Sequence, residues 1–140
     1  MKTFTASVDS KASLQQAWRA WIDLPNWPDH DPTLGWIKLD KFEEGARGKL
    51  KPKSAPFAST IIIENIVKEK CFDIRTPLPG CSMISRHEIA KLPSGGTKFI
   101  FTAEFTGPLA GLFFAMIGKG IQKNVGPTME LLSNLAVDKY

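Results

Sequence analysis

The chain has few cysteines and histidines, and it has no long apolar run. Its 140 residues include only two cysteines and two histidines. Cys71 and Cys81 make neither a zinc cluster nor a disulfide framework, and we expect them to be free thiols at opposite ends of a hairpin. The longest apolar run, residues 109–117, is too short to cross a bilayer. We therefore expect no metal site, no cofactor and no integral membrane segment.

Sequence motifs of the common chemistries do not stand out either: there is no Ser-His-Asp order, glycine-rich phosphate loop or metal-ligand spacing. The net charge is +4, but the basic residues are scattered, without an arginine-rich run. This pattern argues against a nucleic-acid partner and leaves open a weak attraction to an anionic membrane surface. The first eight residues lack the apolar segment of a signal peptide, so we expect a cytoplasmic protein.

The longest segment with a single regular pattern is residues 106–140. Apolar side chains recur there at helical spacing and predict one long helix, with Gly107 as its N-cap and Pro108 as its first residue. Pro127 should kink this helix about one turn before the proline. Gly120 falls on the inward face, where a glycine indicates either close packing against a sheet or empty space beneath the helix.

The first part of the chain predicts a strand and two short helical pieces. Apolar and polar residues alternate over residues 3–8, as in a half-buried strand. Ser13 and Gln16 have the spacing of a capping box and open a helix that ends before Pro25. Residues 26–32 are rich in proline and predict a turn or a single helical turn.

The middle of the chain is typical of strands, because β-branched and aromatic residues alternate with polar ones between turn-forming segments. The element order predicts a single α+β domain over residues 1–140. Its antiparallel sheet has one apolar face, which the terminal helix covers. The six strands expected after the helical pieces are residues 36–42, 48–53, 58–68, 71–77, 81–92 and 97–105.

Seven short motifs occur in order over almost the whole chain, at residues 17–23, 27–32, 45–48, 78–80, 86–89, 96–97 and 105–109. With these motifs the chain resembles the START-like (SRPBCC) superfamily, specifically its polyketide cyclase/dehydrase-like branch. The resemblance implies a helix-grip fold, in which a curved antiparallel sheet of about seven strands wraps a long C-terminal helix around an apolar cavity. Two short helices follow the first strand. Members bind lipids, sterols, polyketides or other hydrophobic molecules, and some are cyclases, aromatases or protein partners.

Two groups near the N-terminus have both a functional and a structural interpretation. Four tryptophans lie between Trp18 and Trp36, where they either wall a hydrophobic pocket or fill the core. His30 stands between Asp29 and Asp31, an arrangement that could serve a general base or a metal. Neighbours in sequence do not converge on one point, so we expect this turn to be structural.

His87 is the candidate polar anchor and the one candidate catalytic residue. By strand alternation it shares the concave apolar face with Met83 and Ser85. It is either a ligand anchor or a core histidine with satisfied nitrogens, and a single bulge would reverse the faces. The residues expected to line the cavity are Trp18, Trp36, Phe72, Ile74, Met83, His87, Phe99, Phe101, Phe113, Met116, Ile117 and Gly120.

These observations support three hypotheses of function. In the first, the protein binds a small hydrophobic molecule of lipid, polyketide or aromatic type, as a monomer or homodimer. In the second, it is an enzyme of the cyclase/aromatase or dehydratase type that folds a flexible poly-carbonyl chain, with His87 as acid or base. In the third, it is a module that binds a partner protein through its apolar helix or its tryptophan-rich segment.

Overall fold

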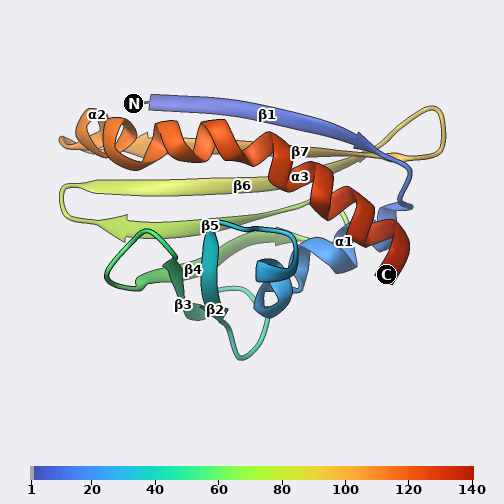
Figure 1. The fold of residues 1–140 in the computed structure, drawn as a ribbon, viewed down its shortest axis with the longest axis horizontal. Coiled ribbons are helices and arrows are strands. Elements are labelled where there is room, and N and C mark those ends of the chain that lie inside the picture. Colours follow the sequence, from blue (N-terminus) through green and yellow to red (C-terminus); the bar gives the residue numbers. More distant parts are fainter. Residues whose placement is uncertain (1) are drawn as a thin grey trace.

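In the computed structural model, which describes residues 2–140, seven strands form one curved antiparallel sheet in the order β1-β7-β6-β5-β4-β3-β2. Consecutive strands are neighbours except that β1 pairs with β7, so the first and last strands lie side by side (Figure 1). The predicted α+β helix-grip fold is confirmed. The strands are β1 (Lys2–Ser10), β2 (Leu34–Lys38), β3 (Arg47–Pro52), β4 (Ser59–Val67), β5 (Cys71–Leu78), β6 (Cys81–Lys91) and β7 (Thr97–Thr106).

Among the predicted strands, the one at residues 36–42 has the most displaced boundaries. Strand β2 begins two residues earlier and ends at Lys38. Phe42 leaves the sheet and packs edge-on against Phe72, with ring centroids 5.1 Å apart. Burying this ring in the core competes with extending the strand, and the burial of an aromatic side chain is the larger gain.

Two short helical segments follow β1, as predicted. In α1 (Leu14–Ile22) the Gln16 N–H donates to the Ser13 hydroxyl at 3.1 Å, and the Ser13 N–H donates to the Gln16 side chain at 2.9 Å. This reciprocal pair is the predicted capping box. The proline-rich segment that follows forms a 3-10 helix, η1 (Leu24–Asp29), with proline in its first turn.

The C-terminal helix is continuous but not uniform. It comprises α2 (Ala110–Phe113), one π-helical turn, η2 (Phe114–Gly118), and α3 (Lys119–Lys139). The sequence predicted the long helix but not its π turn, in which backbone hydrogen bonds join residues five apart instead of four. Figure 1 shows the helix running beside β7 and then turning toward α1.

The predicted N-cap of this helix is wrong, because Leu109 rather than Gly107 occupies that position. Gly107 has φ +106°, and a Cβ there would lie 2.7 Å from the Gly80 carbonyl oxygen. The Leu109 N–H donates to the same carbonyl at 2.8 Å. Gly107 therefore serves the close crossing of the β5–β6 turn, which any side chain would obstruct.

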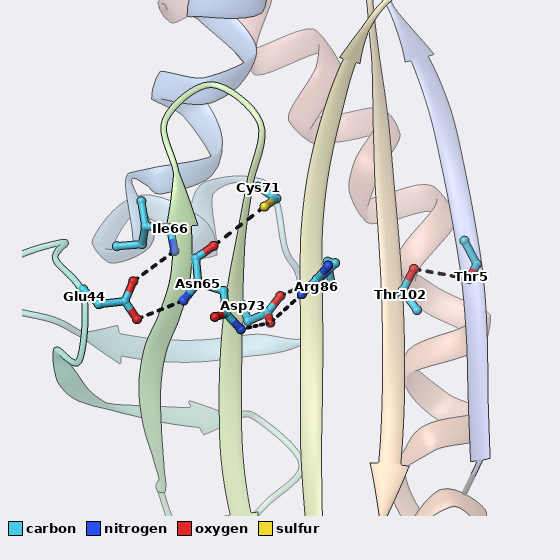
Figure 2. Close-up of polar contacts among 8 residues, drawn as sticks. All are labelled: Thr5, Glu44, Asn65, Ile66, Cys71, Asp73, Arg86 and Thr102. Carbon is cyan, nitrogen blue, oxygen red and sulfur yellow. Dashed lines mark hydrogen bonds and ion pairs between the residues drawn. The ribbon is translucent and has the colours of Figure 1, made fainter.

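The convex face of the sheet carries a network of polar side chains (Figure 2). Arg86 donates to Asp73 through two nitrogens, at 2.9 and 3.1 Å, and Asn65 donates to the same carboxylate at 2.8 Å. Asn65 lies in an irregularity of β4 with φ +54°, and the Glu44 carboxylate accepts from its backbone N–H at 3.0 Å. Figure 2 also shows the Thr5–Thr102 contact that joins β1 to β7.

Asp73 is 3% exposed, so replacing it should test how much this network stabilises the sheet. We expect Asp73→Ala to lower the free energy of unfolding by about 2–3 kcal/mol, because Arg86 and Asn65 lose a common acceptor. Urea unfolding followed by circular dichroism measures the change. Glu104→Ala, on β7, is the control and should change stability by less than about 0.5 kcal/mol. Equal effects of the two substitutions would contradict this role of Asp73.

Candidate ligand-binding site

A cavity of about 720 Å³ lies between the concave face of the sheet and the C-terminal helix. Ligand pockets in proteins range from about 300 to 1,000 Å³, so this volume suits a small organic molecule. Strands β3 to β7 form its floor, the helix forms its roof, and η1 with the residues after it closes one end. Most of the lining is apolar, with a few polar side chains at defined places.

The alternation of the strands directs the floor residues into the cavity. On β5, Ile74 and Thr76 face inward, and on β6, Ser85 and His87 do so. The register pairs Ile74 with Ser85, so these residues form adjacent rows across the floor. Thr76 and Ser85 are 6% and 7% exposed and supply hydroxyl groups to an otherwise apolar surface.

The roof comes from the π turn and the start of α3. Met116 and Ile117 from η2 and Gly120 from α3 line the cavity. A Cβ at Gly120 would meet nothing within 4 Å, whereas one at Gly118 would lie 2.7 Å from the Phe114 ring. Close packing therefore falls to Gly118, and Gly120 faces open space. π turns often occur at functional sites, and this one forms the helical wall of the cavity.

His87 is enclosed by aromatic rings. It stacks on Phe72 with centroids 4.5 Å apart and an interplanar angle of 3°, and Trp21 meets it edge-on at 5.0 Å. The residue is 3% exposed, and its Nδ1 is buried without a hydrogen-bond partner. Burial lowers the pKa of His87 to about 4, against the opposing charge of Asp73. The imidazole is therefore neutral at pH 7 and has an unsatisfied nitrogen.

His30 is a second cavity-lining histidine, which the sequence analysis assigned to a structural turn. It is 5% exposed, its Nδ1 also lacks a partner, and burial lowers its pKa although Asp31 and Asp29 oppose the shift. Trp27 lies between the two histidines, with ring centroids 6.3 Å from His30 and 5.5 Å from His87.

The sequence does contain a signal for His30. A 3-10 helix has three residues per turn, so side chains three apart share a face. Leu24, Trp27 and His30 follow this spacing, and all three are buried. The proline-rich sequence predicted a turn or a single helical turn, and only a 3-10 helix places these three side chains on one face.

The end of the chain holds η1 in place. The Tyr140 hydroxyl donates to the Asp23 carboxylate, next to the start of η1, and Lys139 Nζ lies 3.7 Å from an Asp29 oxygen. Burial, followed by the bond to Asp23, raises the pKa of Tyr140 to about 12, so this donor keeps its proton. The terminus of α3 thus stabilises the segment that carries Trp27 and His30.

Eight of the predicted lining residues lie in the cavity wall, including His87 and Gly120. The other four lie elsewhere. Phe72 and Phe99 are fully buried, and Trp21 packs edge-on against Phe99 at 5.0 Å, so α1 covers this part of the floor. The eight that line the cavity are Ile74, Met83, His87, Phe101, Phe113, Met116, Ile117 and Gly120.

The two tryptophans among the remaining four have different neighbours. Trp18 packs in the core between Phe42 and Phe72, at 6.3 and 5.9 Å. Trp36 follows an irregularity in the pairing of β2 with β3, and Lys38 Nζ lies 5.0 Å from its ring centroid. The cavity is lined instead by Trp21 and Trp27, the other two of the four tryptophans that were considered as pocket walls, which the predicted lining left out.

Within residues 2–140, no three His, Cys, Asp or Glu side chains converge as a metal site would require. Over the same residues, no helix is both long and apolar enough to cross a membrane.

Fold and cavity together define a helix-grip protein with an internal, mainly apolar chamber. The profile of a known family, described as polyketide cyclase / dehydrase and lipid transport, matches residues 1–136. The chain belongs to this family, which confirms the resemblance found in the sequence.

Solved structures share the fold at low sequence identity. The ZhuI aromatase/cyclase from Streptomyces sp. R1128 is 14% identical, with a TM-score of 0.76 and coverage of 96% of this chain and 93% of that one. Norcoclaurine synthase from Thalictrum flavum, solved with dopamine and hydroxybenzaldehyde, is 11% identical, with a TM-score of 0.75 and coverage of 99% and 88%. No curated protein sequence matches the chain. At these identities the likeness shows the fold.

The buried histidine makes stability depend on pH. Since the pKa of His87 falls from 6.5 to about 4 on folding, its contribution is complete above pH 6.5 and is lost as the pH falls toward 4. The loss amounts to about 3 kcal/mol. His87→Phe preserves the stack on Phe72 and should flatten this part of the pH profile of urea unfolding. If the variant and the wild type gave parallel profiles, the buried neutral imidazole would be contradicted. The same measurement on His30→Phe gives the contribution of the second histidine to the pH dependence of stability.

Gly120 tests the open space beneath the helix. We expect Gly120→Leu to fill the mouth of the cavity and to weaken the binding of an apolar fluorescent dye. The matched control is Gly111→Leu, which also meets nothing within 4 Å but does not line the cavity. Both substitutions gain up to about 1 kcal/mol of helix propensity. Equal dye binding by the two variants would show that the space near Gly120 is not part of the binding cavity.

Proposed function

We propose that the protein binds a small hydrophobic molecule in the cavity, with His87 as the polar anchor. The observation that carries this proposal is a buried histidine, His87, which has an unpartnered Nδ1 and lies in the wall of a mainly apolar cavity of about 720 Å³. A buried polar atom without a partner costs about 1–3 kcal/mol, so a ligand that pairs with it recovers this cost on binding.

The chemistry of the lining limits the ligand class. The body of the ligand is apolar, because aromatic and aliphatic side chains form most of the wall. Each Å² of apolar surface that the ligand buries there stabilises the complex by about 25 cal/mol. Its inner end carries a hydroxyl or carbonyl group, since a neutral imidazole donates or accepts one hydrogen bond per nitrogen. Thr76 and Ser85 offer further partners along the floor. A lipid, polyketide or aromatic molecule with an oxygenated end meets these requirements.

An enzymatic role of the cyclase/aromatase or dehydratase type is the second candidate, and the presence of two histidines in one wall favours it. Acid–base chemistry uses pairs of titratable groups whose environments differ. A pKa of about 4, however, makes His87 a weak general base at pH 7. Binding without turnover is therefore the function that the geometry supports best.

The setting of this function is part of the proposal. We propose a cytoplasmic protein that acts as a monomer or homodimer without a nucleic-acid partner. The free thiols of Cys71 and Cys81 support a reducing compartment.

The first experiment is native mass spectrometry of freshly purified protein, followed by organic extraction of the bound material. A discrete co-purified molecule identifies the ligand class. If only the apo mass appears, and no lipid, polyketide or aromatic compound raises the melting temperature, the binding proposal fails.

His87→Phe then separates the two candidates. With the extracted ligand, or the best compound of the panel, we expect affinity to fall about tenfold through the loss of one hydrogen bond. Ile89→Val, on the same strand outside the cavity wall, is the control and should bind like the wild type. If the wild type turns over a poly-carbonyl substrate and His87→Phe loses about a hundredfold or more of this rate, the enzymatic function replaces the binding one.

A further inference from the structure

The rim of the cavity carries an unusual number of exposed apolar side chains. Phe57 is 80% exposed, Met116 65%, Leu112 53%, Leu109 41% and Ile117 36%. Exposed apolar residues are ordinary when scattered, whereas a group of them marks an interaction surface. We call these five residues the mouth patch.

Three segments bring the mouth patch to one end of the sheet. The β3–β4 hairpin supplies Phe57, whose neighbours Ala55 and Ser59 line the cavity together with Met116 and Ile117. The β5–β6 turn lies beneath Leu109, because a Cβ at Gly80 would come within 2.8 Å of that side chain. Figure 1 shows α2 and the β5–β6 turn at the same end of the molecule.

The two segments that supply the residues of the mouth patch contain basic residues and no acid, and Asp31, after η1, is the acidic residue in the cavity lining. Residues 45–63 contain four basic residues and no acid, and residues 105–129 contain two lysines and no acid. Lys53 lines the cavity itself, and Lys119 and Lys123 lie beside the lining residues Gly120 and Asn124. Within residues 2–140, the ion pairs of the structure include none of these three lysines.

We propose that the mouth patch docks on an anionic lipid bilayer. Exposed apolar side chains ringed by lysines are the combination that holds a protein in the interface plane, since the apolar groups enter the acyl boundary and the cations attract anionic headgroups. An acidic protein would complement the lysines, but an 80% exposed phenylalanine and four further exposed apolar side chains fit acyl chains better than a polar protein surface. In this orientation the cavity opens toward the membrane, and an apolar ligand enters without crossing water.

Docking is independent of the identity of the ligand, so its test does not rely on the proposed binding function. The assay is co-sedimentation of the full chain with vesicles of phosphatidylcholine containing phosphatidylglycerol, compared with vesicles of phosphatidylcholine alone. We expect binding to the anionic vesicles only, and a loss of this binding as salt screens the charges.

Charge reversal provides the first pair of variants. Lys53→Glu/Lys119→Glu/Lys123→Glu should lower vesicle partitioning by roughly a hundredfold or more, because each lysine near an anionic surface contributes roughly fivefold. The control is a second variant with the same net charge, in which three exposed lysines at the other end of the sheet are reversed: Lys68→Glu/Lys70→Glu/Lys91→Glu. We expect the control to bind at least tenfold more tightly than the mouth variant. Equal losses would show that net charge alone governs binding and would overturn the proposal.

Removal of apolar groups provides the second pair. The variant Phe57→Ser/Leu112→Ser should abolish sedimentation with anionic vesicles at moderate salt. The control, Val67→Ser/Leu131→Ser, replaces two apolar residues outside the patch that are each 47% exposed, and it should sediment like the wild type. Neither Phe57 nor Leu112 lines the cavity, so dye uptake from solution should remain. Circular dichroism checks that all variants fold.

Two further outcomes would also overturn the proposal. The first is a wild-type protein that ignores anionic vesicles at low salt. The second is a wild-type protein that instead binds an acidic carrier protein and loses this binding in the lysine variant, because the patch would then be a protein interface.

Discussion

The architecture depends on how a single helix covers the concave face of a seven-stranded sheet. Among the contacts between helix and sheet are two close ones: Gly118 packs under the Phe105 ring, and the Ser133 hydroxyl lies 2.7 Å from that of Ser10. Both contacts lie over β7 and β1, at one side of the sheet. The concave faces of the middle strands receive no such cover, and the cavity is the space that remains. A glycine at the first contact makes this geometry possible, because a Cβ there would push the helix away.

The wall of this cavity contains two buried histidines with unpartnered nitrogens. Protein interiors rarely leave a buried nitrogen without a partner, and exceptions concentrate at functional sites. His87 and His30 are two such exceptions in the same wall, joined by Trp27. Burial lowers the pKa of both imidazoles and keeps them neutral at pH 7, which suits them to hydrogen bonding with an uncharged oxygen. The family has many activities on one fold, so the identity of these wall residues, rather than the fold, decides the ligand.

The two faces of the sheet differ in chemistry, with a polar network on the convex face and an apolar cavity on the concave one. On the convex face, the Asp73 carboxylate joins β4, β5 and β6 through Asn65 and Arg86, and Glu44 holds the irregular end of β4. These polar contacts stabilise the strands from outside, so the concave face can remain apolar and partly empty. The side chains of this polar network lie apart from the lining of the cavity. The mouth of the cavity adds a third region, in which exposed apolar and basic residues point to a membrane surface.

The sequence alone determined the local elements and much of the floor. The capping box at Ser13, the strand alternation on β5 and β6, and the apolar stripe of the helix are short-range patterns, and they predicted the fold and eight residues of the wall. Only the tertiary structure decided which apolar side chains the cavity receives. Phe72 and Phe99 point to the same face as Ile74 and Phe101, but α1 packs over them and seals them in the core. His30 reaches the wall because η1 has a three-residue period and is held by the distant Tyr140. Such contacts join segments that are far apart in the sequence, and local periodicity carries no information about which of two equivalent faces another segment will cover.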